Sequence, residues 1–261
     1  MTTTRIAVRA GDPRAHVDLV VGSLAPRLVS RTSNSAHVAV SAAGMLLLGG
    51  DVVHVEVDVG PDSTLELEDV GGTVAYPATG AASRWTLDAG VGSGGTLLWR
   101  ALPLVVAEGA RVERRTELGL DTGARAVIRE TIVLGRQGET GGTLTSQVSI
   151  TDADGPVLFE TLEVDGSAPE PGVLGPARVL DAVVAVGFRP GAEPGAMQLD
   201  QPGAVARHLG DQTHESRLDD VWARWSTGAR SIGGVAATAV APAPASGGSP
   251  PREVDPARSI E

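Results

Sequence analysis

The sequence predicts a mainly β fold of stacked, helicoidal sheets made of short hairpins or coils, with one or two C-terminal helices and a disordered C-terminal tail. From Leu87 to Arg129, apolar runs, glycine turns and extended returns repeat, with Gly94, Gly109 and Gly123 about 15 residues apart. Hydrophobic residues make up 42% of the chain but aromatic residues only 3%, so the core must consist of thin aliphatic side chains that suit closely stacked sheets. The 34 glycines supply the turns.

We expect one β-rich domain over residues 1–232, with its helical segment at about 200–227. Residues 233–261 are rich in Pro, Ala, Gly and Ser, and such a segment cannot bury enough apolar area to offset its ordering entropy. The sequence therefore predicts a disordered tail over 233–261.

The N-terminal part predicts strands. Residues 52–59 place Val at every odd position and His54, Glu56 and Asp58 at even positions, which is the period-2 pattern of a half-buried strand. A Gly-Gly-Asp turn that ends at Asp51 comes just before it.

The C-terminal half continues this pattern and then changes. Residues 143–164 predict a hairpin, 167–176 a proline-rich loop and 179–188 a short buried strand. A short helix is expected from about Pro202 to Leu209.

A second C-terminal helix is predicted by apolar side chains at positions i, i+3, i+4 and i+7, namely Leu218, Val221, Trp222 and Trp225. Ser216 and Asp219 have the spacing of a capping box at its start. The two tryptophans favour either a docking surface for a partner or packing on the β body.

Composition excludes several classes of function. A net charge of −11 argues against nucleic acid as a partner, because phosphate binding needs a basic surface, and it is compatible with basic proteins or cations. The absence of Cys excludes disulfides, cysteine zinc sites and thiol nucleophiles. No signal pattern and no membrane-length apolar run occurs, so we expect a soluble, cytoplasmic protein with no membrane partner.

Sequence motifs do not favour an enzyme. The segment from Gly90 to Gly95 matches a dinucleotide fingerprint formally, but a strand-like run follows where the fingerprint needs a helix, so a turn is favoured. Neither a nucleophile elbow nor a Walker loop occurs.

The face formed by His54, Glu56 and Asp58 is the candidate metal-binding feature. An imidazole and two carboxylates could hold a divalent cation transiently, but alternate residues on a strand lie about 6–7 Å apart, which is wide for one ion. The alternative is a solvated polar face. No firmly bound metal or cofactor is expected.

The segment from Arg129 to Glu139 places an apolar strand between charged ends. Glu130 and Arg136 are an even number of residues apart and would share one face of a regular strand, before a turn marked by Gly135 and Gly138. The alternatives are an ordinary edge strand with a surface ion pair and a shaped edge that binds a protein.

In this segment and in two earlier motifs of the sequence, the chain resembles the UreD (UreH) family of urease accessory proteins. The resemblance covers about Ser33 to Val186 and follows three motifs in order. These are Gly49-Gly50-Asp51 through the turn at Pro61, Leu102-Pro103 with Gly109-Ala110-Arg111, and Glu130 through Gly135-Arg136 to Gly138-Glu139. The chain departs from the family at residues 68–76, where a Thr/Gln-rich strand is usual, and at 137–140, where a small apolar residue is usual.

The resemblance implies a non-catalytic scaffold for urease maturation with a β-rich helicoidal fold. It implies binding of the urease apoprotein and of UreF, and through UreF of the GTPase UreG, so that nickel reaches the urease metallocentre. The implied partner-binding residues are Asp51, Glu130, Arg136, Glu139, Trp222 and Trp225. A nickel route through the interior is also implied, with His54, Glu56 and Asp58 the first face to examine.

Two other functions remain open. A carbohydrate- or ligand-binding β-module would need exposed aromatic side chains, of which the chain has few. A β-helical polysaccharide-active enzyme would need paired carboxylates on neighbouring coils, and Glu113, Glu117 and Glu130 are the dense candidates.

Overall fold

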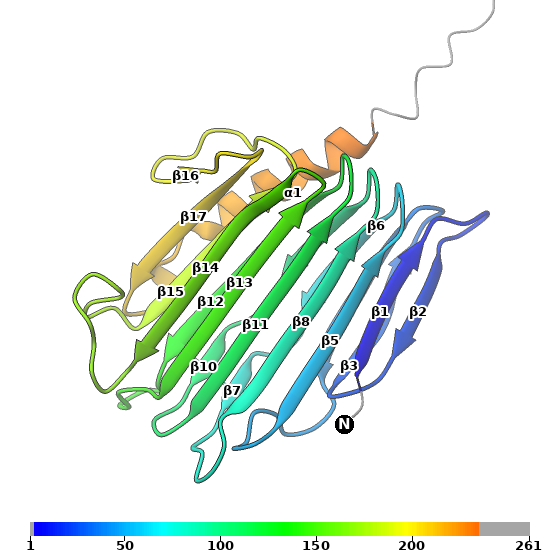
Figure 1. Cartoon of the computed structure of the whole chain (residues 1–261). Coiled ribbons are helices and arrows are strands. Elements are labelled where there is room, and N and C mark those ends of the chain that lie inside the picture. Colours follow the sequence, from blue (N-terminus) through cyan, green and yellow to red (C-terminus); the bar gives the residue numbers. More distant parts are fainter. Residues whose placement is uncertain (1–2, 235–261) are drawn as a thin grey trace, which may run out of the picture.

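Two β-sheets pack face to face, and one helix covers the outer face of the second sheet (Figure 1). The structure, a computed structural model, describes residues 3–234. The prediction of a mainly β fold with stacked sheets and a C-terminal helix is confirmed. Of the disordered tail predicted over residues 233–261, residues 233 and 234 belong to the helix, and the rest lies outside the described residues.

The first sheet, sheet A, has the strand order β14-β13-β11-β8-β5-β1-β2. Its strands are β1 (Thr4–Arg9), β2 (His16–Val20), β5 (Val52–Val59), β8 (Ser83–Val91), β11 (Arg111–Leu120), β13 (Thr143–Asp152) and β14 (Gly155–Asp165).

The second sheet, sheet B, has the order β16-β17-β15-β12-β9-β6-β4-β3, with β10 paired to β12 and β7 paired to β10. Its strands are β3 (Leu24–Arg31), β4 (Ser35–Ala42), β6 (Thr64–Asp69), β7 (Thr73–Ala75), β9 (Thr96–Arg100), β10 (Leu104–Val106), β12 (Arg125–Leu134), β15 (Val179–Val186), β16 (Met197–Gln198) and β17 (Gly203–Gly210).

The central strands form coils that alternate between the sheets. The chain runs from β5 to β6, from β8 to β9 and from β11 to β12, crossing from sheet A to sheet B each time. The neighbouring central strands of each sheet are therefore parallel, as in β5-β8-β11-β13 and β6-β9-β12. The turns that cross over need a backbone conformation that glycine adopts without strain, with φ of +68° at Gly94 and +70° at Gly123.

Coils, rather than hairpins, thus build the centre of the fold. Hairpins occur at β1-β2, β3-β4 and β13-β14, and the last is the hairpin predicted for residues 143–164. The short buried strand predicted at 179–188 is β15.

Each strand separates an apolar inner face from an outer face, because successive side chains alternate. In β5 the four odd-numbered valines are buried in the core between the sheets, while the even positions face outward. A second core lies between sheet B and the helix and includes Leu98, Val127 and Val183.

The helix α1 (Leu218–Gly234) follows a short 3-10 helix, η1 (Thr213–Glu215). The apolar face predicted for this helix is confirmed, because Leu218, Val221, Trp222 and Trp225 all belong to the second core. Within residues 3–234, no helix is both long and apolar enough to cross a membrane.

The helix expected from Pro202 to Leu209 is wrong, because these residues form most of β17 and pair with β15. Ala and Val in this segment fit either a helix or a strand, and pairing with the free edge of β15 decides between them.

The capping box predicted at the start of α1 is incomplete. The Leu218 N–H donates to Ser216 Oγ (3.2 Å), but the Asp219 carboxylate binds arginines instead of the Ser216 backbone.

Candidate functional site

An ion pair joins the two sheets through the interior of the protein. Arg114 lies on the inward face of β11 and Glu130 on the inward face of β12, and the guanidinium donates to the carboxylate. Their side chains are only 10% and 21% exposed. Because unpaired charges are costly in such surroundings, each residue depends on the other.

A third ionisable group, Asp69, lies at the end of β6 near this pair. Its carboxylate accepts hydrogen bonds from Trp99 Nε1 (3.3 Å) and the Leu102 N–H (3.2 Å). Burial raises the pKa of Asp69 to about 6, although these bonds and the charge of Arg114 act in the opposite direction. Asp69 can therefore gain or lose its proton close to neutral pH.

Two small cavities meet at Glu130. One, of about 30 Å³, is lined by Asp69, Trp85 and Arg114 among others, and also by Glu130. The other, of about 50 Å³, is lined by Glu130 and by Glu160 and Arg207. These volumes hold a few water molecules at most.

A second ion pair ends this row of charges. Arg207 on β17, the strand next to the edge of sheet B, donates to Glu160 on β14, the edge strand of sheet A. We refer to Asp69, Arg114, Glu130, Glu160 and Arg207 as the inter-sheet track. It crosses the strands, from β6 to β14.

Two polar atoms of this interior have no hydrogen-bond partner among the residues described. They are Nε1 of Trp85, whose side chain lines the smaller cavity, and Oγ1 of Thr116, two residues after Arg114 on β11. Buried polar atoms of this kind are normally satisfied, and Trp85 Nε1 adjoins a cavity large enough for a water molecule.

The carboxylates of the inter-sheet track suit a divalent cation that binds weakly and dissociates easily. Carboxylate and water oxygens exchange more easily than thiolates, and the chain has no Cys. Across residues 3–234, no three His, Asp or Glu side chains gather into a metal-binding cluster. The track instead offers carboxylates one at a time, and the guanidinium of Arg114 stands between Asp69 and Glu160.

The candidate metal face is on the outside of the protein. His54, Glu56 and Asp58 do share one face of β5, as predicted, but it is the outer face of sheet A, so their assignment to an interior route is wrong. Each contacts an acidic or basic side chain of a neighbouring strand. The pairs are His54 with Asp88 (2.8 Å), Glu56 with Arg5 (2.7 Å) and Asp58 with Arg9 (2.6 Å).

Glu130 and Arg136 do not share a strand face. The strand β12 ends at Leu134, and Gly135, with φ of +75°, reverses the chain into a turn. In that turn Arg136 Nε donates to Glu139 Oε1 (2.8 Å), far from the interior position of Glu130. The strand is also not an edge, because it pairs with β9 and β15.

The remaining predicted partner-binding residues are Asp51, Trp222 and Trp225. The tryptophans are 8% and 2% exposed, so their side chains form core and cannot be a docking surface in this state. Asp51 is half-buried and accepts the Leu48 N–H (2.9 Å), which stabilises the turn before β5.

Four members of the track were not predicted as site residues, namely Asp69, Arg114, Glu160 and Arg207. A signal for Arg114 was present in the sequence, because a charge interrupts the alternating apolar positions of its strand as Glu130 does in the next. Opposite charges at such positions on consecutive strands predict an interior ion pair.

Comparison with known proteins gives a consistent result. The profile of a family described as UreD urease accessory protein matches residues 21–239. Urease accessory protein UreD 1 of Streptomyces griseus is 37% identical over 210 residues, covering 78% of this chain and 82% of its own length. The corresponding proteins of Streptomyces avermitilis and Parafrankia are 36% and 34% identical, over 70% and 71% of this chain and 76% and 75% of their own lengths.

Proposed function

The chain belongs to the UreD family of urease accessory proteins and so has a role in urease maturation, and from this premise we propose that it is a non-catalytic cytoplasmic scaffold that passes nickel to urease. In this proposal it binds the urease apoprotein together with UreF- and UreG-type partners, and nickel crosses it along the inter-sheet track.

The observation that carries the proposal is the row of ionisable side chains inside an otherwise aliphatic β-stack. The carboxylates of Glu130 and Glu160 are largely removed from water, at 21% and 29% exposed, and such groups cost stability, so a role beyond stability is favoured. The track places Asp69, Glu130 and Glu160 in sequence from one end of the interior to the other. Oxygen ligands of this kind lower the energy of a cation without trapping it.

The size of the two cavities determines whether a hydrated ion could pass along the track. Volumes of about 30 and 50 Å³ hold a few water molecules, at roughly 10–15 Å³ for each, which is too little for a nickel ion with a full shell of water. The ion pair of Arg114 and Glu130 lies where the cavities meet. In this proposal the structure corresponds to the closed state of the track, and passage would require Arg114 to release Glu130.

Exposed apolar side chains at one end of the track support docking of a partner there. Val70 (62% exposed) and Leu102 (37%) flank Asp69 at that end, whereas the exposed Phe159 (72%) lies on the outer face of sheet A, opposite to Glu160 on β14. Exposed apolar groups beside a functional opening are typical of sites where proteins associate.

The two alternative functions receive less support. Glu113 and Glu117 face outward from β11 in ion pairs with Arg84 and Arg115, whereas Glu130 faces inward, so the three carboxylates do not form a catalytic pair. Among the aromatic side chains, Phe159 alone is exposed, which leaves little surface for stacking on sugars. The relatives are accessory proteins rather than enzymes.

The test is to express urease with its accessory proteins and with Glu130→Gln in this chain. This variant keeps the shape of the side chain but removes its charge, so we expect urease activity and urease-bound nickel to fall together while the scaffold remains in its complex. Glu113→Gln is the matched control, because Glu113 lies on the outer face of sheet A. Full activation by Glu130→Gln would contradict the proposed route.

A further inference from the structure

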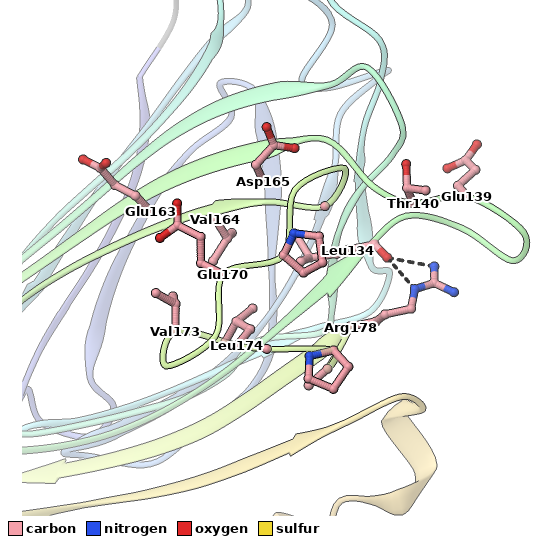
Figure 2. A pocket seen from close by; sticks show the side chains of 15 residues that line it. Leu134, Glu139, Thr140, Glu163, Val164, Asp165, Glu170, Val173, Leu174 and Arg178 are labelled. Carbon is pink, nitrogen blue, oxygen red and sulfur yellow. Dashed lines mark hydrogen bonds between the residues drawn. The ribbon is translucent and has the colours of Figure 1, made fainter.

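A pocket of about 260 Å³ lies at the end of β14, outside the inter-sheet track. It is formed by the end of β14, the loop over residues 166–178 and the turn that follows β12 (Figure 2). Its wall includes the apolar side chains of Leu134, Val164 and Leu174, and its rim carries carboxylates.

Two of the rim carboxylates are not used within the described part of the chain. Glu163 and Glu170 have no ion pair and no side-chain hydrogen bond among residues 3–234, and Figure 2 shows them on the same side of the pocket. The other two are engaged. Glu139 binds Arg136, and Asp165 accepts hydrogen bonds from Ser167 (2.8 and 2.7 Å).

The positive charge at the pocket is also engaged. Arg178 Nε and Nη2 donate to the Leu134 carbonyl (3.0 and 2.8 Å), and Nη2 also donates to the Arg136 carbonyl (2.9 Å). Arg178 therefore fastens the pocket wall to the turn. An anion would face Glu163 and Glu170 with little of this guanidinium available to it.

We propose that this pocket receives a cationic side chain, arginine or lysine, from a partner protein. Such side chains combine an aliphatic stem with a charged head. The stem fits the wall of Val164 and Leu174, and the head meets Glu163 and Glu170. The occupant belongs to a partner protein because the pocket is smaller than the range of about 300–1,000 Å³ that is usual for small-molecule sites.

The ionisation of the rim agrees with this assignment. Hydrogen bonds from Arg136 lower the pKa of Glu139 to about 2, and the bonds from Ser167 hold the pKa of Asp165 below its usual value. Both groups stay charged in mildly acidic solution, so the field at the pocket remains negative. The net charge of −11 attracts the same basic partners from a distance.

The test uses two peptides, acetyl-Gly-Arg-Gly-amide and its analogue with citrulline, which has the same shape as arginine but no charge. Each is titrated into the full-length, isotope-labelled protein, and binding is followed by NMR shifts of backbone amides. We expect the arginine peptide to shift resonances of residues 134–142 and 163–178, and the citrulline peptide to leave them in place.

Two double variants complete the test. Glu163→Gln with Glu170→Gln should weaken binding of the arginine peptide about tenfold or more, since charge-assisted hydrogen bonds are lost. Asp121→Asn with Asp154→Asn removes the same charge at the opposite end of sheet A and should leave the affinity within about twofold. Equal binding of both peptides, shifts elsewhere in the protein, or equal losses in the two variants would overturn the proposal.

This test is independent of nickel passage, because it needs no urease, no metal and no other accessory protein. Failure of the track proposal would leave the peptide result unchanged, and the reverse also holds.

Discussion

Arg129 and Asp181 form a buried two-point ion pair between β12 and β15, in which Arg129 Nε and Nη2 donate to the two carboxylate oxygens (3.1 and 2.8 Å). Asp181 is 1% exposed and also accepts hydrogen bonds from Thr131 (2.9 Å) and Ser216 (2.6 Å). Arg129 reaches on to Asp219 in the first turn of α1 (2.6 Å). Asp181 thus fixes the start of the helix on sheet B.

Replacing Asp181 by Ala should destabilise the protein strongly. The change removes an acceptor from the buried Arg129 and Thr131 and from the half-buried Ser216, and breaking such a pair costs about 3–5 kcal/mol in the free energy of unfolding. Urea unfolding followed by tryptophan fluorescence measures the loss. Arg100→Ala is the control, because its ion pair with Asp219 is exposed and contributes about 0–1 kcal/mol.

The pH dependence of this contribution has a definite sign. Burial raises the pKa of Asp181, but the hydrogen bonds from Arg129, Ser216 and Thr131 outweigh it and leave the pKa below its usual value. The stabilisation is therefore complete above the unfolded pKa of about 3.9 and is lost as pH falls through the lower folded pKa. Similar losses in Asp181→Ala and Arg100→Ala at neutral pH would contradict the tethering role.

Asp69 should give the opposite dependence at higher pH. Its folded pKa is raised to about 6, so the folded protein binds a proton more tightly than the unfolded chain does. Stability should then fall by about 2–3 kcal/mol as pH rises from 4 to 7. The Asp69→Asn variant should lose this part of the dependence. Urea unfolding at several pH values checks it, and a variant with the wild-type dependence would contradict the raised pKa.

The inter-sheet ion pair predicts that stability and function can be separated. Arg114→Ala leaves Glu130, which is 21% exposed, without its partner, which should cost about 1–3 kcal/mol. The double variant Arg114→Leu with Glu130→Leu removes both charges and should recover most of that stability, while urease activation stays low because the track has lost its central carboxylate. A double variant that is stable and fully active would refute the track.

Trp225→Ala should destabilise the protein rather than weaken a partner contact specifically. The indole is 2% exposed in the core between α1 and sheet B, and removal of a buried aromatic side chain costs about 3–5 kcal/mol. Unfolding experiments on the isolated protein measure this. An unchanged stability with lost partner binding would restore the docking role expected from the sequence.

The outer face of β5 should tolerate change. His54→Ala combined with Asp58→Asn removes the contact with Asp88 and weakens the one with Arg9, whose members are partly or largely exposed, and each contact contributes about 0–1 kcal/mol. Urease activation in cells should stay at the wild-type level. A marked loss of urease activation at normal protein abundance would indicate that this face does take part in metal handling.

The alternation of apolar and polar residues and the glycines at turns explain how much of the fold could be predicted. Alternating valines in β5 and the glycines at Gly94 and Gly123 are local signals, and they predicted strands and turns correctly, but they did not decide between hairpins and coils. The conformation of β17 could not be predicted in this way, because its Ala and Val residues take their structure from pairing with β15. Tertiary pairing decided that segment.

The site was less accessible to prediction, since its members meet only in three dimensions. Glu130 was singled out, but its partner Arg114 lies 16 residues earlier in the other sheet. For Trp222 and Trp225, helical periodicity defined a common face correctly. Whether that face is covered depends on the position of sheet B, and the apolar periodicity of one helix gives no information about that position.

The coiled arrangement of β5 to β12 has a consequence for how the family could change in size. Each central coil contacts chiefly its two neighbours, as in proteins built by linear repetition. Gene duplication of one coil would add a rung to both layers without disturbing the rest. The distance from Asp69 to Glu160 would then grow by one strand spacing of about 4.8 Å, so relatives of different length could serve partners set further apart.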